Sequence, residues 1–219
     1  MPARRGTPTR RWRELCLRSR LRPTIGAVAW IDTVDWADAE GPLRDAYDWQ
    51  AAALGEPAEF TMLGSLYPPI VEERLRLYRA VEHCPSQLTA IERQAAALVT
   101  SRLNGTDHCA SGLRLKLESL GLAPGALDAI DADPAEVHTG EGRFDAICGY
   151  AAKLTLSPAA VTRDDLDPLR EHGLSDLDIL DLNNMVAYYA YINRVVMGLG
   201  LRSVMSSTHQ ATSAVPGER

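Results

Sequence analysis

The sequence predicts an all-α fold, and three observations support this prediction. Apolar residues recur at helical spacing along most of the chain. No segment alternates apolar and polar residues between hairpin turns, as half-buried strands would. Several hydrophobic runs begin with a Ser or Thr followed three residues later by an acidic residue, which is a helix-start pattern. We therefore expect a bundle of capped helices.

The expected helices follow one another with short connections. Their approximate ranges are 40–54, 69–84, 89–103, 107–120, 124–132, 144–156, 163–171 and 177–199.

Residues with known preferences for helix ends define these helices. Pro69 suits a first turn, because the N–H that proline lacks has no partner there. Thr89 with Glu92, Thr162 with Asp165 and Ser175 with Asp178 form capping-box patterns. Glycines or Asn-Gly follow the expected ends, at residues 104–105, 121, 173, 198 and 200.

The composition indicates a folded domain between two atypical ends. The 219 residues are 46% hydrophobic and 24% charged, with a net charge of −6. Residues 1–27 are rich in arginine, and we expect a disordered extension there, with a targeting peptide as the alternative. The domain is expected at residues 28–202 and a flexible tail at 203–219. Because the domain is acidic, a nucleic-acid partner is not expected.

The four cysteines, Cys16, Cys84, Cys109 and Cys148, form neither a metal-binding pattern nor a disulfide framework. A reducing cytoplasm is therefore the expected location. No apolar run reaches the ~18 residues of a transmembrane helix. No motif indicates a bound metal or cofactor, so neither is expected.

The most informative segment runs through the 89–103 helix, breaks at Asn104-Gly105, and places Cys109 at the start of the next helix. The N–H groups and dipole of a helix N-terminus favour negative charge. This position favours a thiolate, which is the reactive form of cysteine. Cys109 is therefore interpreted either as a functional thiol or as a buried, unreactive cysteine.

This segment resembles the alkylhydroperoxidase-like (AhpD-like) branch of the carboxymuconolactone decarboxylase family. The resemblance extends over about 170 residues, and its marks are Leu66-Tyr67-Pro68-Pro69, Leu88-Thr89, Tyr150 to Thr155, Ser157 to Thr162, and Ile192-Asn193-Arg194. It implies an all-helical bundle that forms a homo-oligomer, with the active site near subunit contacts. It also implies a peroxidase site with two cysteines, a glutamate and a histidine.

Only one of those four site residues is present here. Cys109 matches the cysteine that attacks peroxide, but Thr106 replaces the cysteine that resolves the oxidised form. Gln94 replaces the glutamate, and an amide does not transfer protons usefully. Leu113 replaces the histidine.

Neighbouring residues supply other candidates for the site. His108 directly precedes Cys109, and adjacent helical residues do not face each other, so His108 is poorly placed to activate Cys109 in its own subunit. It either lies on the surface or reaches a cavity, within its own subunit or across an interface. Thr106 is expected to cap the helix that begins at Asp107. Asn193 and Tyr189, on the last helix, are expected to line a pocket together with Leu113.

Three hypotheses of function follow. The first is a non-redox enzyme that acts on a small organic molecule, in specialised metabolism for example, through His108, Thr106, Gln94 and pocket residues. The second is a peroxidase that uses Cys109 alone and is restored by a separate thiol. The third is an inactive binding or scaffold subunit. The fold does not choose between them.

Overall fold

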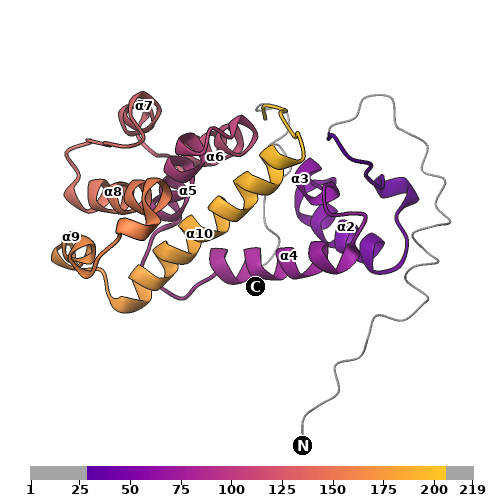
Figure 1. The fold of residues 1–219 in the computed structure, drawn as a ribbon, viewed down its shortest axis with the longest axis horizontal. Coiled ribbons are helices and arrows are strands. Elements are labelled where there is room, and N and C mark those ends of the chain that lie inside the picture. The colour runs from indigo at the N-terminus through magenta and orange to yellow at the C-terminus, as the bar shows by residue number, and fades with distance from the viewer. Residues whose placement is uncertain (1–28, 206–219) are drawn as a thin grey trace, which may run out of the picture.

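A computed structural model describes residues 29–205, and in this part of the chain every regular element is a helix (Figure 1). The predicted all-α class is confirmed. The α-helices are α2 (Gly41–Leu54), α3 (Glu59–Met62), α4 (Pro68–Glu82), α5 (Ala90–Leu103), α6 (Asp107–Ser119), α7 (Pro124–Ala132), α8 (Gly142–Leu156), α9 (Asp167–Glu171) and α10 (Asp176–Gly198). Three 3₁₀ turns are η1 (Trp36–Asp38), η2 (Pro158–Ala160) and η3 (Arg163–Leu166). The predicted basic extension at 1–27 lies outside the described residues.

Two differences from the predicted helices have local causes. The single helix expected at 163–171 is divided into η3 and α9. Pro168 has no N–H to donate to the carbonyl of Asp164, so the regular hydrogen-bond pattern cannot pass through it. The four-residue α3 was not predicted, because one helical turn is too short to show a hydrophobic period.

Helix α5 forms the centre of the larger hydrophobic core. Ala95, Ala96, Ala97, Leu98 and Val99 are all fully buried there, and α6, α8 and α10 pack around them (Figure 1). Three consecutive alanines allow neighbouring helices to approach from several sides. The Thr89–Glu92 capping box fixes where α5 begins, as predicted.

A smaller core joins α2 to α4. Tyr47 and Leu43 of α2 pack there against Val71 and Leu75 of α4. Helix α4 also contacts α10, so it connects the two cores (Figure 1). None of the helices between residues 29 and 205 is long and apolar enough to cross a membrane.

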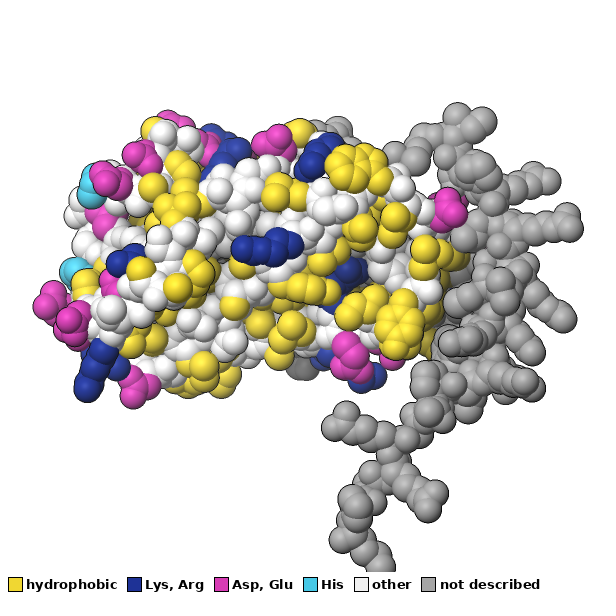
Figure 2. Space-filling view, in the orientation of Figure 1, with side chains coloured by type: hydrophobic (Ala, Val, Ile, Leu, Met, Phe, Trp, Pro, Cys, Tyr) yellow, Lys and Arg dark blue, Asp and Glu magenta, His cyan; other side chains and the backbone are white. Residues whose placement is uncertain are grey.

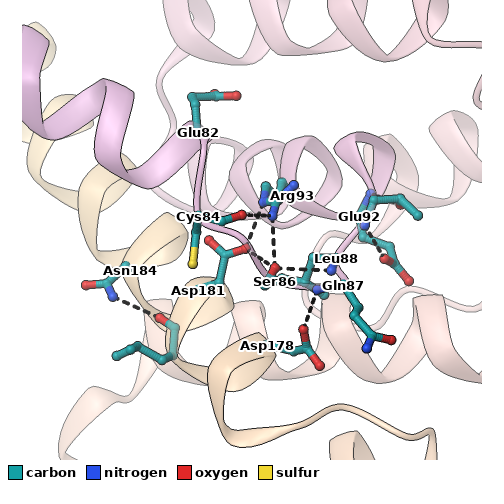
Figure 3. Close-up of polar contacts among 12 residues, drawn as sticks. Glu82, Cys84, Ser86, Gln87, Leu88, Glu92, Arg93, Asp178, Asp181 and Asn184 are labelled. Carbon is teal, nitrogen blue, oxygen red and sulfur yellow. Dashed lines mark hydrogen bonds and ion pairs between the residues drawn. The ribbon is translucent and has the colours of Figure 1, made fainter.

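A buried ion pair holds the α4–α5 loop, α5 and α10 together (Figure 3). The Nε of Arg93 lies 2.8 Å from Asp181 Oδ2, and both side chains are largely buried. The Nη2 of Arg93 donates to the Cys84 carbonyl and to Ser86 Oγ, at 2.8 and 2.9 Å. Ser86 Oγ in turn donates to Asp181 Oδ2 at 2.5 Å. The loop therefore has one defined position on α10.

We predict that Asp181→Ala lowers the free energy of unfolding by about 3–5 kcal/mol, because it leaves the charge of Arg93 buried and unpaired. Urea denaturation measures this change. The control is Glu73→Ala, which removes an exposed pair with Arg76 and should cost about 0–1 kcal/mol. Equal costs for the two variants would contradict the assigned role of the ion pair.

Candidate functional site

Cys109 lies in the first turn of α6, but its thiol is not exposed. The residue is 9% exposed and belongs to the larger core. Burial raises the pKa of the Cys109 thiol to about 12. Of the two interpretations of Cys109, the structure supports the buried, unreactive one, because the cost of desolvating a charged sulfur exceeds the favourable effect of the helix N-terminus.

Gln94 contacts a carboxylate that the sequence analysis did not identify. Its Nε2 donates to both oxygens of Glu82, the last residue of α4, at 3.0 and 3.1 Å. The Nζ of Lys116, on α6, lies 3.4 Å from the same carboxylate. Glu82 comes twelve residues before Gln94 and has no motif around it. Only the tertiary structure brings the two side chains together, because they come from different helices.

The contact with Glu82 also fixes the orientation of the Gln94 amide. Gln94 is 1% exposed, and only its N–H groups can face a carboxylate favourably. Its Oε1 therefore points away from Glu82, and this buried oxygen has no hydrogen-bond partner. An unsatisfied acceptor of this kind is costly unless a ligand or water fills the position.

Three tyrosines lie near Glu82, and two of them, Tyr188 and Tyr189, also lie near Cys109. Tyr78 and Tyr188 have ring centroids 5.8 Å apart, and Tyr188 and Tyr189 meet edge to face at 5.6 Å. Burial is the main cause that raises the pKa of all three hydroxyls, and the charge of Glu82 raises each of them further. The Cys109 sulfur also raises the pKa of the Tyr188 and Tyr189 hydroxyls. We call these residues, with Gln94, the Glu82–Cys109 cluster.

His108 is buried, so its interpretation as a surface residue is wrong. Its Nδ1 lies 2.9 Å from Ser203 Oγ and 3.2 Å from the Ser203 carbonyl oxygen. Ser203 Oγ donates its own hydrogen to Glu59 at 2.5 Å. Both Ser203 oxygens therefore accept from His108, which assigns the proton to Nδ1 and leaves Nε2 as a buried lone pair without a partner.

Burial lowers the pKa of His108, and this effect exceeds the opposing effects of the Glu59 charge and of the hydrogen bond that His108 donates to the Ser203 carbonyl. Neutral His108 is thus favoured in the folded protein.

The remaining predicted residues have different environments. Thr106 occupies the N-cap position of α6, but its side chain makes no capping hydrogen bond, so that prediction is wrong. Its Oγ1 is instead buried without a partner. Leu113 packs in the same core as Cys109. Asn193 is fully buried, accepts a 3.3 Å hydrogen bond from Ser101 on α5, and has an unpartnered Nδ2.

Residues 203–205, which were expected to belong to a flexible tail, contact α6. Ser203 contacts His108, and the backbone N–H of Met205 donates to Ser111 Oγ at 2.9 Å. Residues 203–205 therefore pack on α6, and the rest of the expected tail lies outside the described residues. Between residues 29 and 205, no group of three or more His, Cys, Asp or Glu side chains is arranged to bind a metal.

An open hollow on the surface is separate from this cluster. It lies between α2 and α4 and is lined by side chains that include Trp49, Leu75 and Arg79. None of the predicted site residues lines it.

Solved structures resemble this chain over most of its length. An uncharacterised peroxidase-related protein from Ralstonia eutropha, described as an alkylhydroperoxidase AhpD core, has a TM-score of 0.74 and 19% identity, covering 87% of this chain and 98% of its own. A peroxidase-related protein from Silicibacter has a TM-score of 0.70 and 20% identity, covering 88% and 100%. A debrominase, solved as a cysteine-to-alanine variant with 2,3,4-tribromopyrrole, has a TM-score of 0.65 and 15% identity, covering 82% and 93%.

No protein-family model and no curated protein sequence matches the chain. The structural likeness agrees with the resemblance found in the sequence, and the order of helices is shared along nearly the whole of each neighbouring chain. This protein has the AhpD-like fold.

Proposed function

We propose that this protein is a non-redox enzyme that transfers a proton within a small organic molecule at the Glu82–Cys109 cluster. One observation carries the proposal: a carboxylate held by the Gln94 amide lies in the same cluster as a cysteine whose thiol is kept protonated. The cluster therefore contains a group suited to acid–base chemistry, whereas its sulfur is in the unreactive form.

In the proposed reaction, the Glu82 carboxylate removes a proton from a carbon or oxygen of the substrate. The resulting carboxylic acid then returns that proton to a different atom of the same molecule. The net change is an isomerisation, so no oxidant, reductant or metal is needed. Gln94 and Lys116 orient the carboxylate, and the free Gln94 Oε1 accepts a hydrogen bond from the substrate.

A second candidate function is thiol chemistry at Cys109. The structural likeness to a debrominase studied as a cysteine variant favours it. Such a reaction requires the Cys109 thiol to lose its proton, and a neighbouring base is then needed. Because Thr106 cannot form a disulfide, a separate thiol would have to reduce the oxidised sulfur.

We also propose that the protein forms a homo-oligomer. Exposed apolar side chains lie on α4 and α10, at Ile70, Leu77, Leu177, Leu180 and Tyr191. Figure 2 shows hydrophobic side chains spread across the face that these two helices present, whereas acidic side chains gather at the end formed by α7, α8 and α9. An apolar face of this kind favours association.

We predict that the protein catalyses exchange of acidic C–H protons with solvent deuterium in some members of a panel of small cyclic ketones and lactones, with and without a carboxylate group. Glu82→Gln should slow this exchange about 10²–10⁴-fold, because the proton acceptor is lost. The measurement is the decay of substrate proton signals by NMR in D₂O. The matched control is Glu73→Gln, an exposed carboxylate on the same helix.

A double variant, Glu82→Gln with Gln94→Glu, exchanges the two side chains and places the carboxylate on α5. It should recover part of the lost rate. Absence of exchange with every compound in the panel would contradict the proposed function.

We predict that iodoacetamide leaves Cys109 unmodified in the native protein at pH 8.5, because its thiol pKa of about 12 leaves very little thiolate. After unfolding in urea, Cys109 should react readily. Mass spectrometry of both samples measures the modification. Rapid native labelling of Cys109 would favour the thiol mechanism instead.

We predict that the free energy of unfolding decreases as the pH falls below about 6.5, partly because of His108. Its pKa is below the ordinary 6.5 in the folded state, so the unfolded chain binds a proton that the folded protein does not. Above pH 6.5 His108 is neutral in both the folded and the unfolded state, so its full contribution to the free energy of unfolding is present. Urea denaturation at pH 7 and pH 5 measures this change. The free energy of unfolding should decrease less between these two pH values in His108→Gln than in the exposed control His83→Gln. Identical losses would contradict this account.

A further inference from the structure

Arg74, on α4, is a buried cation without an acidic partner. The residue is 3% exposed, and among residues 29–205 no carboxylate forms an ion pair with it. Its Nη2 donates to the backbone carbonyls of Phe60 and Thr61, at 3.2 and 3.1 Å. Its guanidinium carbon lies 4.0 Å from the centroid of the Phe60 ring. These contacts provide acceptors for some of the guanidinium N–H donors, but they supply no negative charge to balance the guanidinium.

Two hydrogen-bond donors beside this charge have no partner. One is Arg74 Nε, and the other is the hydroxyl of Thr61, which is fully buried. Arginine is rarely buried unless it is paired, and an unsatisfied buried donor is costly. A carboxylate would supply the missing negative charge together with two acceptor oxygens.

Arg74 is also close to the Glu82–Cys109 cluster, because Tyr188, a member of that cluster, is affected electrostatically by Arg74 as well as by Glu82 and Cys109. The surroundings of Arg74 are aromatic, with Phe60 stacked on it and Tyr47 and Tyr191 nearby. A flat organic anion would match both the charge and these rings.

We propose that Arg74 and Thr61 bind the carboxylate of a small, preferably aromatic, organic acid, and that this class of compound is the substrate. The role as substrate rests on the proposed function. The binding itself does not, and it can be measured without turnover.

The experiment compares benzoate with the neutral analogue benzamide on the full-length protein, by thermal shift and calorimetry at constant ionic strength. Benzoate should bind saturably and raise the melting temperature, whereas benzamide should not. Arg74→Gln should abolish the shift. The control Arg79→Gln, which changes an exposed arginine on the same helix, should retain it.

Since Arg74→Gln also removes bonds to α3, Thr61→Val provides a test that does not depend on them. This isosteric change removes only the unpartnered hydroxyl. We expect benzoate to bind about tenfold more weakly, without any decrease in the melting temperature of the free protein. A lower melting temperature of the free variant would show that the hydroxyl has a structural partner, which overturns the proposal.

Equal effects of benzoate and benzamide, no benzoate binding, or unchanged binding to Thr61→Val would each show that Arg74 serves only to hold α3, and would overturn the proposal. These results are distinct from a failure of the proposed function. If benzoate binds as expected but no compound exchanges protons, the anion site stands and the proton-transfer reaction is wrong.

Discussion

The arrangement of this protein depends on the buried ion pair between Arg93 and Asp181. One guanidinium group joins the start of α5, the loop after α4 and the first half of α10, and Ser86 completes the network. Because the pair is shielded from water, its hydrogen bonds are electrostatically stronger than they would be at the surface. Glu82 and Gln94 lie immediately next to this junction in the chain. The position of the Glu82 carboxylate on the Gln94 amide therefore follows from how the junction fixes the loop after α4 on α5.

Removal of charged groups from water explains most of the chemistry of the site. Cys109 has a favourable position at a helix N-terminus, yet burial dominates and keeps its proton in place. Burial has the corresponding effect on His108, where it favours the neutral ring. Arg74 retains its charge because a guanidinium group does not lose its proton at ordinary pH. A buried group of this kind therefore attracts an anion, whereas a buried thiol or imidazole becomes neutral.

The relation between Gln94 and Glu82 changes how the loss of the expected glutamate is interpreted. From the sequence, Gln94 indicated that a proton-transferring group had been lost, and it was one of several candidates for a non-redox site. In the structure the same amide binds another carboxylate, which comes from the end of the preceding helix. We therefore interpret Gln94, which stands in place of the expected glutamate, as the partner of a carboxylate supplied by a different residue, Glu82. In this view the replacement of the expected cysteine by Thr106 and of the expected histidine by Leu113 is consistent with a change of chemistry on a retained fold.

The sequence by itself determined the helical class, the starts of α5 and α10, and the close succession of helices. These features depend on local signals: a hydrophobic period, a Thr or Ser cap with an acidic residue in the first turn, and a glycine after the last turn. It also identified the residues that differ from the expected peroxidase site. It could not find Glu82 or Arg74, because neither has a motif and each acquires its role from neighbours on another element. Nor could it determine the state of Cys109, since the pKa of a thiol depends on how much water the surrounding helices exclude, and only the tertiary structure decides that.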